Sequence, residues 1–136
     1  PMGDVDPKTW DQVMSINLTA NWRLVRSMDP LLQRSDAGRA IFVTSTVGAE
    51  ARAYWAAYSV SKAALEMMVK IYAEENANSR VRANLINPGS TRTGMRAQAM
   101  PGEDPKTVKP PEDVTDAFVQ LADPACEHNG ITLDCS

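Results

Sequence analysis

Residues 45–62 have the sequence S-T-V-G-A-E-A-R-A-Y-W-A-A-Y-S-V-S-K, and the rest of the chain can be ordered around this stretch. Tyr58 and Lys62 are four residues apart in a run with few helix breakers, so a helix would place both on one face. Ser45 lies thirteen residues before Tyr58, just after the apolar run at 40–43, which predicts a buried strand. A serine after a strand and a Tyr/Lys pair on the next helix can meet at one crevice of an open α/β sheet.

These three side chains suit acid–base chemistry. A free tyrosine has a pKa near ~10 and is a poor base at neutral pH. An ammonium held close to the phenol favours the phenolate by charge attraction, and Ser45 could orient a substrate oxygen toward the Tyr58 hydroxyl. A Tyr-x-x-x-Lys pair alone is also a common helix pattern, so this prediction depends on the serine upstream.

Length and composition fit one globular domain. The chain has 136 residues, of which 43% are hydrophobic, and it carries a formal net charge of −3. Because its Lys and Arg residues are scattered and form no basic stripe, we expect no nucleic-acid partner. No run approaches the ~18 consecutive apolar residues of a membrane span, and no secretory signal pattern opens the chain. We therefore expect a cytoplasmic protein without a membrane partner.

Residues that commonly bind metals are few. Cys126 and Cys135 are the only cysteines, and His128 is the only histidine. Their spacing does not match a zinc site and no other Cys or His completes four ligands, so we predict no metal. A disulfide stays open on the sequence alone, although a reduced pair fits a chain without a secretory signal better.

Helical and extended patterns alternate along the chain. The predicted helices cover residues 7–32, 55–76 and 110–121, and the predicted strands cover residues 39–46, 81–86 and 131–133. This alternation predicts a parallel α/β sheet. Residues 90–111 are rich in Pro, Gly and charge, which is typical of a long, mobile connection that covers a binding site.

Two residues of the first predicted helix depart from its pattern. Asn17 interrupts the apolar band, and a buried amide there needs hydrogen-bond partners. A structural role and a functional role both fit this residue. Pro30 is expected to disturb the last turn of the helix.

The predicted helix at 55–76 is apolar over most of its circumference. Such a helix is usually buried on two sides, here against the sheet and against a second subunit. Met67, Met68 and Ile71 extend its apolar band beyond the side needed for the sheet.

Together these residues resemble the short-chain dehydrogenase/reductase family. Four motifs occur in the family's order: Asn17 within I-N-L-T-A, Ser45 with Tyr58-Ser59-Val60-Ser61-Lys62, Asn87-Pro88-Gly89 with Thr91 and Thr93, and Pro111-Glu112-Asp113-Val114 followed by Asn129-Gly130 and Leu133-Asp134. The run I-N-P-G-S-T-R-T-G-M-R at 86–96 is similar to a bacterial oxidoreductase subgroup.

The resemblance implies a doubly wound, three-layer Rossmann-type sheet and the interconversion of an alcohol and a carbonyl, both small molecules, with NAD or NADP. Tyr58 would be the general acid/base, Lys62 would assist it and hold the nicotinamide ribose, and Ser45 would orient the substrate oxygen. Asn17 would hold a water that links Lys62 to solvent. Tyr58 would also bind the cofactor together with Lys62, and the nicotinamide would be lined by Pro88, Gly89, Thr91 and Thr93.

One part of the family's pattern does not occur in these residues. There is no Gly-x-Gly motif, so the loop that binds phosphate at a helix N-terminus is missing from residues 1–136. We therefore expect the carboxyl-terminal portion of a single NAD(P)-binding domain, without its amino-terminal βαβ half. The strand at 39–46 would then have an open edge, which favours association. We predict a homodimer or homotetramer formed through the helices at 7–32 and 55–76.

A second hypothesis keeps the catalytic side chains but not the activity. Without the phosphate-binding loop, the chain would be an inactive fragment that persists as a self-associating interaction module. A titration with NADPH, followed by fluorescence, would separate the two hypotheses.

Overall fold

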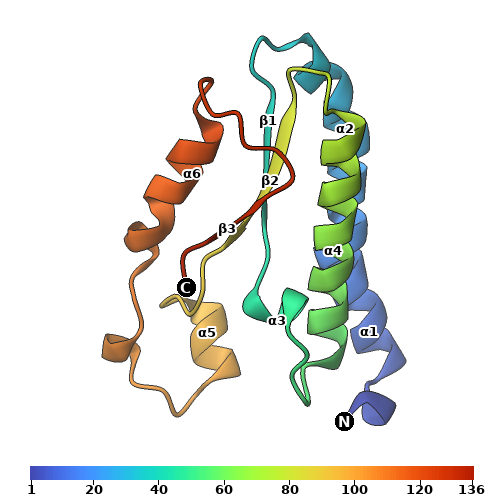
Figure 1. Cartoon of the computed structure of the whole chain (residues 1–136). Helices are drawn as coiled ribbons and strands as arrows, with labels where there is room; N and C mark the ends of the chain where they lie inside the picture. The colour runs from blue at the N-terminus through green and yellow to red at the C-terminus, as the bar shows by residue number, and fades with distance from the viewer.

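A three-stranded parallel sheet lies between two groups of helices (Figure 1). The computed structural model describes all residues, Pro1–Ser136. The strand order follows the chain: β1 (Arg39–Val43), β2 (Arg82–Asn87) and β3 (Thr132–Asp134). Phe42 of β1 is the register partner of Leu85 of β2, and Leu85 is also the partner of Thr132 of β3. The predicted parallel α/β sheet is confirmed, and the outer edge of β1 pairs with no strand.

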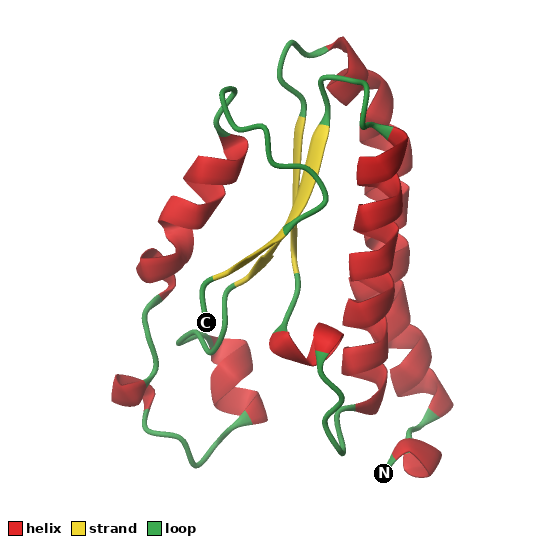
Figure 2. Cartoon of the chain, viewed as in Figure 1, coloured by secondary structure: helices red, strands yellow, loops and turns green.

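Two long helical segments cover one face of the sheet (Figures 1 and 2). They are a rod of α1 (Pro7–Met14), the π-helical η2 (Ser15–Thr19) and α2 (Ala20–Arg34), and the helix α4 (Ala56–Glu75). The rod begins as predicted, because the Asp6 carboxylate accepts from the Thr9 backbone N–H at 3.0 Å and Pro7 occupies the first turn. The predicted disturbance at Pro30 is wrong, since α2 continues to Arg34. The carbonyl that Pro30 leaves without a donor belongs to Arg26, an exposed residue, so water can satisfy it.

The main core forms where α4 packs on β1 and β2. Its buried members come from α4, the two strands and the residue just before β2: Phe42, Leu65, Val69, Tyr72, Ala73, Val81, Ala83 and Leu85. On the other face of β2, Ile86 packs with Ala117 and Leu121. Because both faces of β2 are covered, its sequence shows no simple apolar and polar alternation.

Shorter elements complete the structure. They are α3 (Thr46–Ala49), α5 (Gly94–Ala99), α6 (Thr115–Ala122), and the 3-10 turns η1 (Met2–Asp4), η3 (Pro105–Thr107) and η4 (Pro111–Val114). β1 is shorter than predicted, because it ends at Val43 and Thr46 already begins α3. The connection predicted at 90–111 contains α5 and η3, and its ends meet in a bridge between Thr91 and Lys109.

The outer side of α4 carries two of the three apolar residues that the sequence assigned to it. Met67 and Ile71 are 58% and 52% exposed. The prediction for Met68 is wrong, because this side chain packs against the main core. No helix in the structure is both long and apolar enough to span a membrane.

Candidate active site

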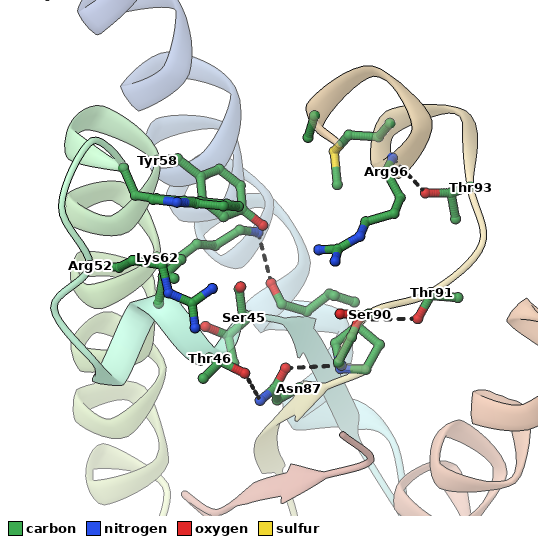
Figure 3. Close-up of a pocket in the computed structure, with 18 of the residues that line it drawn as sticks. Ser45, Thr46, Arg52, Tyr58, Lys62, Asn87, Ser90, Thr91, Thr93 and Arg96 are labelled. Atoms are coloured by element: carbon green, nitrogen blue, oxygen red, sulfur yellow. Dashed lines mark hydrogen bonds between the residues drawn. The ribbon is translucent and has the colours of Figure 1, made fainter. Parts of the chain in front are cut away.

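A cavity of about 830 Å³ opens at the carboxyl ends of β1 and β2 (Figure 3). All but one of the sequence-predicted site residues line it, namely Ser45, Tyr58, Lys62, Pro88, Gly89, Thr91 and Thr93. The exception is Asn17, which does not line it. The parallel topology explains this convergence, since loops that follow neighbouring parallel strands leave the sheet at the same edge.

Tyr58 and Lys62 occupy the first two turns of α4. The Lys62 Nζ donates to the Val43 carbonyl at 3.0 Å and lies 5.8 Å from the centroid of the Tyr58 ring. Partial burial disfavours the charged ammonium and lowers the pKa of Lys62. In Figure 3 the Tyr58 hydroxyl, the Lys62 ammonium and the Ser45 side chain point toward the same part of the cavity.

The turn that carries Ser45 is fixed on both sides by side-chain hydrogen bonds. The buried Thr44 hydroxyl donates to Glu66 Oε1 of α4 at 2.6 Å. On the other side, the Asn87 amide at the end of β2 donates to the Thr46 hydroxyl at 3.0 Å. The turn that carries Ser45 is therefore bonded to α4 through Thr44 and to the end of β2 through Thr46.

The hydrogen bond between Thr44 and Glu66 is not among the features predicted from the sequence. Glu66 lies one helical turn beyond Lys62, and a carboxylate on an otherwise apolar side of a helix was the available signal. Its partner, Thr44, precedes Ser45 directly but lies twenty-two residues from Glu66 in the sequence. Only the packing of α4 beside β1 brings the two together.

We expect Gly48→Ala to lower the free energy of unfolding by about 1–3 kcal/mol, the usual cost of overpacking. A Cβ at Gly48 would lie 2.6 Å from Glu66 Oε1 and 2.9 Å from Thr44 Oγ1, so the buried pair would have to separate. Urea unfolding followed by circular dichroism measures the change. Gly94→Ala is the matched control, because a Cβ there meets nothing within 4 Å. An equal effect of both substitutions would contradict this account.

Asn17 lies behind α4, in the π-helical η2. Its amide donates to the Ser61 hydroxyl at 3.1 Å, and that hydroxyl donates to the Tyr58 carbonyl at 2.7 Å. The backbone carbonyl of Asn17 accepts from the Asn21 amide at 2.9 Å. Asn17 thus connects the rod to α4 through Ser61 and makes no hydrogen bond to the side chain of Tyr58 or Lys62.

The opposite wall of the cavity follows β2. Gly89 has a φ of +69°, a left-handed conformation that glycine adopts without strain, and a Cβ there would lie 2.6 Å from the Ser136 Cα. The Asn87 side chain accepts from the Gly89 backbone N–H at 3.1 Å, which fixes the turn. The Thr91 hydroxyl donates to the Gly89 carbonyl at 3.2 Å, and Thr93 accepts from the Arg96 backbone N–H at the start of α5.

Known proteins share this sequence and geometry. A family model described as short chain dehydrogenase matches residues 1–104. The uncharacterized oxidoreductase YciK of Escherichia coli K12 is 43% identical over 135 residues, which cover 98% of this chain and 53% of that protein.

Solved structures of short chain dehydrogenases are also similar to this chain. A short chain dehydrogenase from Salmonella enterica serovar Typhi superposes with a TM-score of 0.96 at 43% identity, covering 100% of this chain and 56% of that one. One from Escherichia coli CFT073, complexed with NADPH, gives 0.95 at 43% identity, covering 100% and 57%. The chain therefore spans about half the length of these relatives. The predicted partial Rossmann-type fold is confirmed.

Proposed function

Because this chain belongs to the short-chain dehydrogenase/reductase family, we propose that it carries the catalytic half of an NAD(P)-dependent oxidoreductase. The enzyme interconverts an alcohol and a carbonyl of a small molecule, in the cytoplasm. The observation that supports this most is the convergence of Ser45, Tyr58 and Lys62 on one cavity of about 830 Å³. A hydroxyl donor, a proton-transferring phenol and an ammonium are the groups that such a proton transfer needs.

Tyr58 is the proposed general acid and base, which protonates the substrate oxygen during reduction and deprotonates it during oxidation. Ser45 donates a hydrogen bond to the same oxygen and holds it in line with the phenol. Lys62 stabilises the negative charge that develops on the Tyr58 oxygen. Its bond to the Val43 carbonyl uses one of three ammonium donors, which leaves donors for Tyr58 and for a ribose hydroxyl.

The walls of the cavity fit a nicotinamide nucleotide by the chemistry of their donors. Lys62 would hold the ribose hydroxyls, and Thr93 would bond the carboxamide or a phosphate. Pro88, Gly89 and Thr91 would line the ring. When bound, the nicotinamide supplies or accepts the hydride of the reaction. The complexes of two similar short chain dehydrogenases with NADP and NADPH support this assignment.

Asn17 completes the proposed machinery from behind α4. Asn17 is bonded to Ser61, and Ser61 is the neighbour of Lys62 in the turn of α4 that packs beside η2. This position supports a role for Asn17 in holding a water that connects Lys62 with solvent. We also propose that two or four copies associate through the rod and α4, which expose the apolar side chains of Leu24, Met28, Met67 and Ile71.

We expect the 136-residue chain alone to bind NADPH at least ~100-fold more weakly than the complete, family-length enzyme. The chain contains no Gly-x-Gly loop, and losing two charge-assisted phosphate hydrogen bonds of about 1.5–3 kcal/mol each accounts for that factor. Fluorescence titration with NADPH measures both affinities.

Each outcome of this titration has a definite meaning. Micromolar affinity of the chain alone would contradict the prediction. Failure of the family-length protein to bind NADPH or NADH would contradict the proposed function and favour the inactive, self-associating fragment.

A further inference from the structure

The cavity carries three cationic side chains and no acidic one. Arg52, Lys62 and Arg96 line it, whereas none of its lining residues is Asp or Glu. The chain as a whole has 17 acidic and 14 basic residues, so the charge of the cavity is opposite to the overall balance. A concave surface with charge of one sign concentrates ligands of the opposite sign.

The three cations differ in whether they already have a role or an ion-pair partner. Lys62 belongs to the proposed proton-transfer machinery. Arg96 donates through Nε and Nη2 to the two carboxylate oxygens of Glu103, at 2.7 and 2.8 Å, so its charge is balanced by a bidentate partner. Arg52 belongs to neither ion pair of the chain, and its guanidinium has no hydrogen-bond acceptor. It is the one cation of the cavity with its full bonding capacity free.

Arg52 is also positioned by an aromatic contact that uses none of its hydrogen-bond donors. Its Cζ lies 5.8 Å from the centroid of the Trp55 ring, and the Trp55 ring lies 6.0 Å from that of Tyr58. A guanidinium over an aromatic face keeps its N–H edge free for an oxyanion and loses less freedom on binding. In Figure 3 the Arg52 guanidinium points into the cavity on the side of Ser45.

We propose that Arg52 pairs with an oxyanion of the substrate, a carboxylate or a phosphate, and that the enzyme prefers acidic alcohols and carbonyls. This inference rests on the proposed function. Arg52 lies between Ser45 and Tyr58 in the sequence, on the wall that would hold the reacting oxygen. The residues proposed to line the nicotinamide, Pro88, Gly89, Thr91 and Thr93, lie on the wall that follows β2, whereas the Arg52 guanidinium lies on the side of Ser45, where the reacting oxygen would be held.

The test uses three aldehydes with the same ring and different charge. They are 4-carboxybenzaldehyde, 4-formylphenyl phosphate and the neutral methyl 4-formylbenzoate, each reduced with NADPH by the complete enzyme. We expect kcat/KM for at least one anionic aldehyde to exceed that for the neutral ester by about 10-fold or more, as a hydrogen-bonded charge pair allows. The two anions distinguish a carboxylate site from a phosphate site.

Variants test whether Arg52 causes the preference for anionic aldehydes. Arg52→Gln should remove the preference through a higher KM for the anionic aldehyde, with the neutral ester and the KM of NADPH changed less than about 3-fold. The Arg52 side chain makes no hydrogen bond in the structure, and the bond from the Trp55 N–H to the Arg52 carbonyl does not depend on the side chain, so the variant should fold normally. Arg92→Gln is the matched control, because Arg92 is exposed on the 90–111 segment and does not line this cavity. Trp55→Leu should reproduce part of the Arg52→Gln loss.

A binding measurement makes the result independent of turnover. Calorimetry with the NADP-loaded enzyme compares 4-(hydroxymethyl)benzoate and 4-(hydroxymethyl)phenyl phosphate with the methyl ester of the benzoate. Tighter binding of an anion that Arg52→Gln abolishes supports the inference even if no aldehyde is reduced, and in that case the proposed function fails alone. Equal binding of anions and ester, an unchanged preference in Arg52→Gln, or an effect confined to the KM of NADPH overturns the inference.

Discussion

Tyr58→Phe is expected to lower kcat of the complete enzyme by at least ~10²-fold, the usual contribution of a positioned general acid or base. The substitution removes only the hydroxyl that would exchange a proton with the substrate oxygen. The ring remains, and with it the contact with Trp55 at 6.0 Å between centroids. Steady-state kinetics with NADPH and an aldehyde measures the loss. Because the other proposed contacts with substrate and cofactor would remain, we expect the KM values to change little.

The matched control is Tyr54→Phe, the same chemical change four residues earlier at the edge of the same cavity. Tyr54 is among the residues that line the cavity, but it is 82% exposed and its hydroxyl makes no hydrogen bond. Its turnover should therefore stay within about 2-fold of the unmodified enzyme, consistent with an exposed side chain. Circular dichroism melting curves confirm that both variants fold. Turnover of Tyr58→Phe close to that of Tyr54→Phe would end the assignment of Tyr58 as acid/base.

The sequence predicted most of the fold because its signals are local. A helix over 55–76 and a strand over 81–86 follow from composition and breakers, and the structure places them at Ala56–Glu75 and Arg82–Asn87. The convergence of Ser45 with Tyr58 and Lys62 also follows from local order, because Ser45 follows β1 closely and the other two lie on α4, the next long helix of the chain. Such features need no knowledge of distant partners.

What the sequence could not predict depends on tertiary contacts. The Thr44–Glu66 bond needs the relative rotation of α4 and β1, and the same rotation decides that Met68 faces the core while Met67 faces outward. A helix that is apolar nearly all round leaves this rotation undetermined. The π-helical turn around Asn17 has no compositional signal, since it differs from an α-helix only in hydrogen-bond register.

Introducing Asp at both Met67 and Ile71 is expected to convert the predicted oligomer into monomers. These residues continue a stripe on the outer side of α4, and α2 carries exposed apolar residues at helical spacing, Leu24, Met28 and Leu31. The two helices are joined by the Tyr72 hydroxyl, which donates to Asp29 at 2.6 Å, so both stripes belong to one rigid layer. A two-fold axis would bring this surface against itself and close the assembly.

The free energies of burial and association indicate that the double substitution should dissociate the oligomer. Leu24, Met28, Met67 and Ile71 are each about half exposed, so burying them in both subunits would contribute about 6–12 kcal/mol. Association costs about 4–15 kcal/mol. Such an interface has little free energy to spare, and the new carboxylates, four per dimer, would have to be buried without partners.

Size-exclusion chromatography with light scattering measures the mass. The matched control is Val119→Asp on α6, where an equally apolar residue is 69% exposed on the other side of the sheet. We expect the Met67/Ile71 variant to elute as a monomer and Val119→Asp to keep the parent mass. An oligomer that survives the double substitution, or that dissociates in Val119→Asp instead, would show that the subunits meet elsewhere.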